Sequence, residues 1–438
     1  MLTSAQILYA NRHNMPFLAM GSGHGSAGAL GNVHEGIQIW TRKMDKIRIS
    51  ADGKTVTVGG GVKVKELIDA LWAAGKQTVT GACECVGIAG PMLGGGHGYL
   101  QGQHGLISDQ LVEARMVLAD GKAVTVSQDS YPDLFWGIRG AGHNFGIVTE
   151  SKHKIYDVAP NSTWAYEAFT FTGDKLEALY SLTNEMMKTQ PAHVMHWGLI
   201  LRIPAIDAVH PVILYFILYD GPASAELEYA SPIHALGPLS VQAGEVPYPL
   251  LPKVTANGND DPPCQSGGVG MLFPIYLKSY DVPALRLVYD AFSEIMQRVP
   301  AFSNSFFLLE GYSVQGVQAI RTATTAFPHR SQKLLLSPAI FYQPNSSLDA
   351  QAEEFGRHAR NLLKAGSGSP EQHAYVNYAH GDESLEEVYG YEPWRLQKLR
   401  WLKKKYDREN KFGFYEPIVL GSRDALPLRE GRPRDALL

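Results

Sequence analysis

The feature that most constrains this chain is the concentration of glycine in three segments of its first third. These segments are 21–26 (GSGHGS), 81–98 and 139–149 (RGAGHNFGIVT). Glycine lets a backbone approach a ligand closely, and successive backbone N–H groups in such loops bind phosphate oxygens. We therefore expect them to surround a flat or anionic ligand, although a plain glycine turn is the alternative for the first segment alone. No long helix opens after that segment, so it is not the G-x-G-x-x-G dinucleotide motif.

Size and charge limit the possible classes of protein. A chain of 438 residues is too long for one ordinary core, which predicts two domains. The net charge of -4 and the pI near 6.4 argue against a nucleic-acid partner. No apolar stretch has the length of a membrane span, and no signal peptide is recognisable at the start. The chain as written is therefore expected not to be exported, and export would require a further upstream segment.

Local patterns predict a mixture of strands and helices. In the first part we expect a helix to about Arg12, strands at 17–20 and 55–58, a helix at 64–74, and a hairpin of 111–118 with 123–126. In the second part we expect a strand at 212–219, helices at 175–187 and 282–298, a loop at 257–268, a strand at 374–378 and a helix at 394–406. A helix that feeds a strand usually follows an earlier strand of a βαβ unit. That leading strand is absent, which would expose a sheet edge.

The cysteines give weak signals. Three cysteines, Cys83, Cys85 and Cys264, are too few for a disulfide framework, and Cys85 is interpreted as a small buried residue. Cys83 and Cys85 with His97 and His104 do not have the spacing of a tetrahedral zinc site. We therefore predict no metal.

Longer segments resemble a known family. The stretches GACECVGIAGPMLGGGHGYLQGQHGLISDQLVEARMVLADG and DLFWGIRGAGHNFGIVTE, with AYVNYAHGDE and LKKKYDRENKF near the C-terminus, resemble the berberine-bridge-enzyme-like branch of the vanillyl-alcohol-oxidase flavoproteins. The resemblance implies an α+β fold. Its PCMH-type FAD-binding domain has two α/β subdomains, and its substrate domain has an antiparallel sheet backed by helices. We expect an FAD-binding domain at 1–155, a substrate domain at 156–368, a returning segment at 369–421 and a loose tail at 422–438.

The same resemblance implies which residues hold FAD. His24 falls where the family links the flavin 8-methyl group to a histidine, and Cys83 falls where a thiol bonds the ring at carbon 6. A noncovalent His24 and an inert Cys83 are the alternatives. The other cofactor-binding residues implied are Gly21, Ser22, Gly23, Gly25, Val86, Gly87, Gly95, Gly96, Gly98, Gly142, Asn144, Ile147, Val148 and Asn377. The family often has an arginine four residues before the linking histidine, where this chain has Met20, so backbone amides must bind the phosphates.

Catalytic roles follow less directly. In relatives a tyrosine of the YVNY motif is the base, and strand alternation at 374–378 would place Tyr375 beside Asn377 with Tyr378 facing away. Tyr375 is therefore the predicted base, and Tyr342, His329 and Glu310 are further candidates that nothing in the sequence distinguishes. Val86 corresponds to a residue that controls oxygen access, and a small valine is typical of oxidases, with simple packing as the alternative.

The implied reaction is a flavin-dependent oxidation. Hydride passes from a small organic substrate to FAD, and molecular oxygen is reduced to hydrogen peroxide. A largely apolar natural-product intermediate is the first expectation for the substrate, and a sugar is the second. A nonredox or oxidative cyclase, a dehydrogenase with another electron acceptor and a non-catalytic binding protein remain alternatives, because a fold does not fix a reaction. Oligomeric state is undefined by the sequence.

Overall fold

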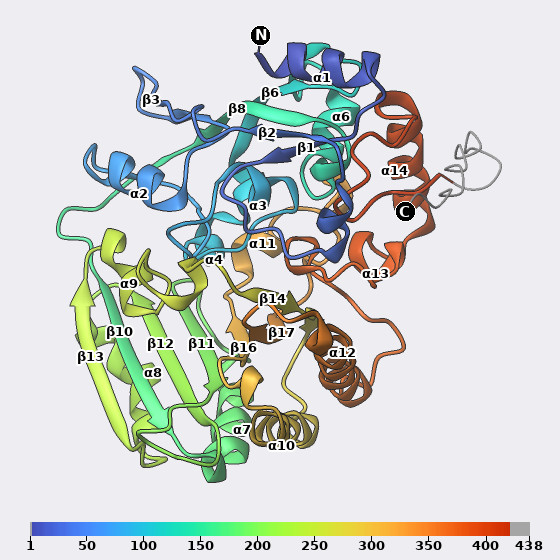
Figure 1. Cartoon of the computed structure of the whole chain (residues 1–438). Coiled ribbons are helices and arrows are strands. Elements are labelled where there is room, and N and C mark those ends of the chain that lie inside the picture. The colour runs from blue at the N-terminus through green and yellow to red at the C-terminus, as the bar shows by residue number, and fades with distance from the viewer. Residues whose placement is uncertain (1, 421–438) are drawn as a thin grey trace.

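The computed structural model describes residues 2–420 and contains two main antiparallel sheets, one in each half of the chain (Figure 1). The first sheet has the order β3 (Ile47–Ile49), β4 (Thr55–Gly59), β8 (Ile147–Lys154), β6 (Leu111–Val117) and β7 (Ala123–Ser127). The predicted hairpin is confirmed, because β6 pairs with β7 up to Val117 opposite Ala123. The short elements around it are α2 (Val64–Trp72), β5 (Lys76–Gln77), α3 (Ala89–Leu93), α4 (Gln101–His104), α5 (Ile107–Gln110), α6 (Pro132–Gly137) and β9 (Tyr156–Asp157).

The start of the described chain packs onto this half of the protein. Helix α1 (Leu2–Arg12) leads into β1 (Phe17–Met20), which pairs in parallel with β2 (Ile37–Trp40). Ile7 and Phe17 are buried in one small cluster with Ile147 of the five-stranded sheet and Phe412 of the C-terminal segment. The predicted helix and strand are therefore confirmed, and β1 belongs to a two-stranded sheet.

The second half is built on an eight-stranded antiparallel sheet. Its order is β13 (Ser240–Val246), β10 (Trp164–Phe171), β12 (Val212–Asp220), β11 (Val194–Leu201), β16 (Phe306–Gly311), β17 (Leu334–Tyr342) and β14 (Val269–Leu272), with β15 (Ile275–Leu277) also on β17. The helices of this half are α7 (Leu176–Met186), α8 (Ala223–His234), α9 (Leu251–Val254), α10 (Val282–Arg298), α11 (Gln315–Gln318) and α12 (Asp349–Gly366). The substrate-domain architecture expected from the sequence, a sheet backed by helices, is thus confirmed.

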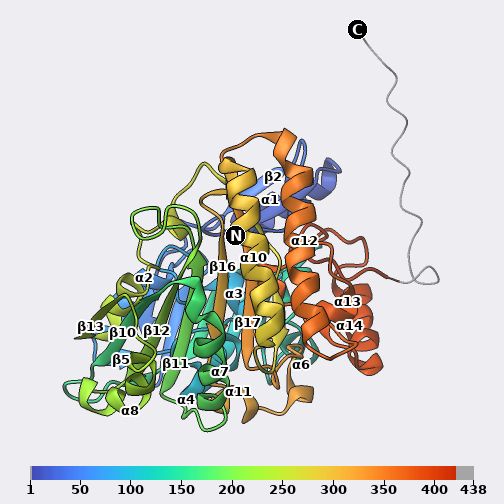
Figure 2. The same ribbon diagram turned by 90° about the horizontal axis from the view of Figure 1, so that it is seen from below.

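The two faces of this sheet have different neighbours. Helices α7, α10 and α12 cover the far face, and α10 and α12 lie side by side (Figure 2). Far-face residues such as Phe171, Ile200 and Ile217 are fully buried against these helices. The near face turns toward the glycine-rich half and belongs to that half's hydrophobic core. The interface between the two halves is therefore formed by one face of a sheet and by glycine-rich loops.

The C-terminal segment returns to the first half of the chain. Helix α14 (Pro393–Tyr406) packs against α6, and α13 (Leu385–Tyr389) precedes it. Lys403 is fully buried, forms an ion pair with Asp407 at 2.7 Å and donates to the Asn144 carbonyl oxygen at 3.1 Å. The side chain of Asn144 also bonds Tyr389 and the backbone of Ile418. Asn144, predicted to contact FAD, thus has its side chain committed to holding this segment.

One secondary-structure prediction is wrong. Residues 374–378 do not form a strand: Val376–Tyr378 is a 3₁₀ turn, closed by a hydrogen bond from Tyr378 N to Tyr375 O at 2.9 Å. The alternation argument for Tyr375 and Tyr378 therefore fails. The predicted tail 422–438 lies outside the described residues. Within residues 2–420, no helix combines the length and apolar character that a bilayer span needs.

Candidate functional site

Two of the predicted loops lie in contact. The backbone N–H of Gly87 donates to Ser22 Oγ at 2.8 Å, which joins the loop that carries His24 to the loop that follows Cys83. More than a third of His24 is exposed, yet partial burial and the nearby Lys63 ammonium lower its pKa. A lowered pKa keeps the imidazole neutral and therefore nucleophilic near pH 7. The structure thus brings the two predicted attachment loops together.

The predicted glycines divide into two groups when a Cβ atom is added to each. At Gly21, Gly23 and Gly87 the added atom meets nothing closer than 3.5 Å, and at Gly23 it meets nothing within 4 Å, so Gly23 borders open space. Gly23 also has a φ of +81°, which favours glycine. At Gly95, Gly96, Gly98 and Gly142 the added atom would lie 1.7–2.7 Å from other protein atoms. The second group is therefore explained by close packing within the protein, whereas the first group would accept a side-chain atom without a clash.

The remaining predicted cofactor residues are mostly buried by protein. A Cβ atom at Gly25 would meet the Leu30 side chain at 2.7 Å. Ile147 and Val148 lie in β8, and their side chains pack into the hydrophobic clusters of the first half. Val86 is partly buried, and its carbonyl oxygen accepts from the N–H of Val64 at 2.8 Å. Contacts of these residues with FAD remain predictions.

Cys85 is buried, as interpreted from the sequence, but the structure also places it in a disulfide bond that the sequence analysis did not predict. Cys85 is bonded to Cys264, and the free Cys83 lies with its sulfur 3.4 Å from both of the bonded sulfurs. Cys264 belongs to the predicted loop 257–268, which is also held by the hydrogen bond from Glu84 N to Asn257 O at 2.9 Å. A separation of 179 residues hides this pairing from any reading of local sequence. Burial raises the pKa of the Cys83 thiol to about 11, helped by the Glu84 and Asp261 carboxylates.

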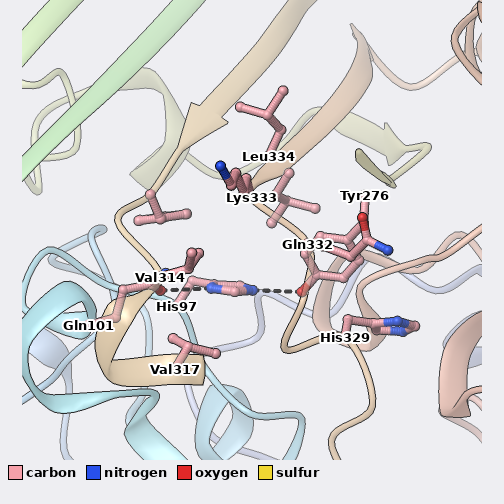
Figure 3. Close-up of a pocket in the computed structure, with 11 residues that line it drawn as sticks. His97, Gln101, Tyr276, Val314, Val317, His329, Gln332, Lys333 and Leu334 are labelled. Atoms are coloured by element: carbon pink, nitrogen blue, oxygen red, sulfur yellow. Dashed lines mark hydrogen bonds between the residues drawn. The ribbon is translucent and has the colours of Figure 1, made fainter. Parts of the chain in front are cut away.

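His97 and His104, the other residues considered for zinc, lie apart from the cysteines. His97 is buried, and its Nδ1 and Nε2 are 2.7 Å and 2.6 Å from Gln101 Oε1 and the Tyr276 hydroxyl (Figure 3). Burial lowers the pKa of His97 to about 4, so its ring is neutral. Since the Gln101 oxygen can only accept, Nδ1 carries the proton and Nε2 accepts from Tyr276. His97 thereby ties the glycine-rich half to β15 of the sheet.

Tyr375 and Asn377 lie beside His97. The Tyr375 hydroxyl oxygen accepts from the backbone N–H of His97 at 3.3 Å and from Asn377 Nδ2 at 2.7 Å. Asn377 Nδ2 also donates to Pro91 O at 3.0 Å, whereas its Oδ1 is buried without a partner. Tyr375 and Asn377 are thus neighbours as predicted, although a turn and not a strand places them together. The unpaired Asn377 oxygen is available to a ligand N–H.

Tyr378 does not face away into packing, contrary to the prediction. Its hydroxyl donates to Glu310 Oε1 at 3.1 Å, and its ring is 5.1 Å from that of Tyr375. Glu310 is fully buried on β16, and burial raises its pKa to about 8. The Cys83 sulfur is close enough to Tyr378 to contribute to the raised pKa of its phenol. Tyr378 is therefore hydrogen-bonded to a fully buried carboxyl of the large sheet.

The other middle-region candidates are bonded elsewhere. His329 Nε2 lies 3.0 Å from the carbonyl oxygen of Val388, and the Tyr342 hydroxyl donates to Asp349 at 2.6 Å. Of the three candidates, Glu310 is the one joined to the YVNY motif. Sequence reasoning missed Tyr276, Trp197 and Tyr312, because single aromatic residues on buried strands carry no local signal of function.

Buried ionisable groups predict the pH dependence of stability. Burial raises the pKa values of Glu226, Glu310 and Glu416 to about 8, and lowers those of His97, His143 and His153 to about 4 and that of His196 to about 3. Between about pH 4 and the ordinary histidine pKa near 6.5 the unfolded chain binds more protons at the histidines, so stability rises with pH. Between about 6.5 and 8 the folded chain retains protons on the carboxyls, so stability falls.

We therefore expect the melting temperature to be highest near pH 6.5, measured by differential scanning fluorimetry from pH 4.5 to 8.5. The histidine contribution dominates the acid side because, within the described residues, nine histidines have a lowered pKa whereas four carboxyls have a raised pKa. A melting temperature that continues to rise up to pH 8 would contradict this account.

The residues present fit a flavin. The glycine backbone at Gly21, Gly23 and Gly87, where an added Cβ atom meets no protein atom closer than 3.5 Å, suits phosphate and ribityl oxygens, and the unpaired Asn377 Oδ1 suits an N–H of the ring. The buried hydroxyl of Ser26, in the same loop as His24, also lacks a partner in the protein. These unsatisfied groups lie in the segments that the sequence assigned to FAD.

Comparisons with known proteins agree with this assignment. Residues 4–127 match the family model described as "FAD binding domain". The chain is 44% identical over 418 residues to the FAD-linked oxidoreductase chyH of Penicillium rubens, covering 94% of this chain and 83% of that protein. Among solved structures, BBE-like 1 of Physcomitrella patens is similar in fold (TM-score 0.81, 23% identity, 96% and 89% coverage). The glucooligosaccharide oxidase of Acremonium strictum is similar too (TM-score 0.77, 21% identity, 95% and 90% coverage). The chain therefore belongs to the FAD-linked oxidoreductases with the berberine-bridge-enzyme-like fold.

Proposed function

We propose that this FAD-linked oxidoreductase is an oxidase that removes a hydride and a proton from a small organic alcohol or similar donor. The observation that carries the proposal is the hydrogen bond from Tyr378 to the buried Glu310. FAD, when bound, accepts the hydride and passes two electrons to molecular oxygen, giving hydrogen peroxide. A natural-product intermediate remains the first expectation for the substrate.

Tyr378 and Glu310 supply the proton acceptor. The hydroxyl oxygen of Tyr378 takes the substrate proton while its own proton moves to Glu310 Oε1, 3.1 Å away. Burial raises the pKa of Tyr378 well above its ordinary value, so phenol alone is a weak base. Glu310, with a pKa of about 8, is matched to proton transfer near neutral pH. The predicted base Tyr375 stays a candidate, and its two N–H donors give it an alternative role in positioning the motif.

The cofactor is proposed to be attached through both His24 and Cys83. The hydrogen bond between the two loops supports this arrangement, and the glucooligosaccharide oxidase of Acremonium strictum has a 6-S-cysteinyl, 8α-N1-histidyl FAD. The lowered pKa of His24 favours attack by its neutral ring, whereas a thiol pKa near 11 leaves little Cys83 thiolate at pH 7. We therefore expect attachment at His24 to precede attachment at Cys83.

Denaturation of the purified protein tests the attachment. We expect the yellow colour to remain with the chain and its mass to increase by one FAD. His24→Ala or Cys83→Ala alone should keep one bond, and the double variant should release all flavin on denaturation. Complete release from the unaltered protein would contradict the covalent proposal.

Reactions carried out without oxygen and under air distinguish an oxidase from a cyclase, a dehydrogenase and a binding protein. Anaerobic bleaching of the flavin by substrate indicates oxidation, whereas an unchanged spectrum with product formed indicates a nonredox cyclase. Peroxide formed in stoichiometric amount under air supports the oxidase. Bleaching without reoxidation by air supports a dehydrogenase, and would overturn the proposed role of Val86 as a residue that permits oxygen access. A colourless protein would indicate a binding protein.

A further inference from the structure

We infer that the indole N–H of Trp197 binds an oxygen atom of the substrate, and that the rest of this substrate is flat and apolar. The inference rests on the proposed function, because it concerns the same site. Trp197 lies on β11 directly opposite Glu310 on the antiparallel neighbour β16. Opposite residues of an antiparallel pair project from the same face of the sheet. The indole is therefore beside the carboxyl that bonds Tyr378.

Both side chains are buried, and each has one polar atom that forms no hydrogen bond within the protein. Trp197 is 4% exposed, and its Nε1 has no hydrogen-bond partner; Glu310 is 0% exposed, and its Oε2 has none. Leaving a buried donor or acceptor unpaired costs about 1–3 kcal/mol. Native proteins contain few such groups, and a neighbouring donor and acceptor next to a proton acceptor indicate a place where a ligand supplies the missing partners.

A second tryptophan, which is equally buried, has a hydrogen-bond acceptor for its indole N–H. Trp136 is 5% exposed, and its Nε1 donates to the Ala323 carbonyl oxygen at 2.9 Å. The aromatic hydroxyls around the site are satisfied too: Tyr276 is paired with His97, Tyr99 with Thr255 and Tyr248 with Thr80. Trp197 therefore differs from Trp136 and from these hydroxyls in having no partner within the protein.

The surroundings define the class of substrate. On this face of β11 and β16, Glu310 is the only ionisable group within the described residues, and the neighbouring positions are apolar: Met195, Leu199, Phe306, Leu308, Leu214, Phe216 and Leu218. The ring of Tyr312 meets that of Trp197 edge-on at 6.3 Å. A saccharide needs partners for many hydroxyls, whereas β11 and β16 present two unsatisfied polar atoms on this face, Trp197 Nε1 and Glu310 Oε2. It fits an aromatic molecule that carries an oxidisable oxygen function.

Thermal unfolding of two matched variants tests whether the indole N–H is kept for a ligand. Trp197→Phe removes a donor without a partner, so we expect its melting temperature to equal or exceed that of the unaltered protein. Trp136→Phe removes an equally buried N–H donor that has a partner, and leaves the Ala323 carbonyl oxygen without its hydrogen bond. We therefore expect the melting temperature to decrease by about 2–4 °C. Equal decreases in the two variants would show that Trp197 has a partner inside the protein, and would overturn the inference.

Ligand binding to the flavin-loaded enzyme tests the substrate class. The probes are 4-methoxybenzaldehyde, 4-methylanisole, which lacks the carbonyl oxygen, and cellobiose, each followed by perturbation of the flavin spectrum. We expect Trp197→Phe to raise the Kd of the aldehyde about 3–10-fold and to leave that of 4-methylanisole unchanged. Equal effects on both aromatic probes, tighter binding of cellobiose, or no binding of either aromatic probe would overturn the inference. A protein without flavin would contradict the proposed function instead, and the thermal comparison would still test Trp197.

Discussion

The Tyr378→Phe variant is expected to reduce its flavin about 10²–10⁴-fold more slowly than the unaltered enzyme when both are mixed anaerobically with substrate. This is the usual contribution of a positioned acid or base. The substitution removes the hydroxyl that donates to Glu310 at 3.1 Å and retains the ring that packs near Tyr375. Stopped-flow absorbance of the flavin measures this step directly and separates it from reoxidation.

Tyr375→Phe is the matched control for this prediction. Its hydroxyl accepts two hydrogen bonds from the protein, so its loss should disturb the turn and lower the rate by less than about tenfold. In the unaltered enzyme the rate should rise with pH through the Glu310 pKa of about 8, because the carboxylate is the active form. A larger loss in Tyr375→Phe than in Tyr378→Phe would restore Tyr375 as the base.

Replacing Arg330 with methionine is expected to lower the free energy of unfolding by about 3–5 kcal/mol, the usual cost of removing one partner of a buried ion pair. Arg330 lies in the substrate half and forms two hydrogen bonds with Asp109 of α5, at 2.7 Å and 3.0 Å. Both side chains are 2% exposed, so the remaining carboxylate would be buried without its charge partner. Guanidinium unfolding followed by circular dichroism measures the loss.

Two further variants make this prediction specific. Asp109→Leu combined with Arg330→Met removes both charges, and we expect it to recover most of the stability lost in Arg330→Met. Arg298 pairs with Glu294 at the surface, where both side chains are more than half exposed. Arg298→Met should therefore change stability by less than about 1 kcal/mol. A similar loss in Arg298→Met and Arg330→Met would show that burial of the pair is unimportant.

Periodicity predicted the regular elements well, because local patterns of apolar residues determine which face is buried. The bounds predicted for α10 are those of the structure, and α14 begins one residue earlier than expected. The strand expected at 374–378 failed because its apolar residues pack in a turn held by local hydrogen bonds, with no neighbouring strand to pair with. Alternation alone cannot reveal the absence of a pairing partner.

The candidate site was only partly predictable for a related reason. Motifs assigned His24, Cys83 and the YVNY segment to the cofactor site, because each lies in a recognisable stretch of sequence, and this assignment stays a prediction. The contact of Glu310 with Tyr378 and the bond of Cys85 to Cys264 join residues 68 and 179 positions apart. Such pairs depend on strand order, which a single sequence does not specify. The sequence also could not show which glycines border a ligand, because several of them lie against other protein atoms in the structure.

The unequal covering of the large sheet has a consequence for engineering. Successive residues of each strand point to opposite faces of the sheet and contact different neighbours. Replacing every second residue on β11 or β16 therefore changes the face directed toward the site and leaves the side chains packed against α7 and α10 unchanged. Transferring the whole sheet with its helices to another protein would expose its apolar near face, which packs here against the first half of the chain. New selectivity in this scaffold is therefore best sought by rewriting alternate positions in place.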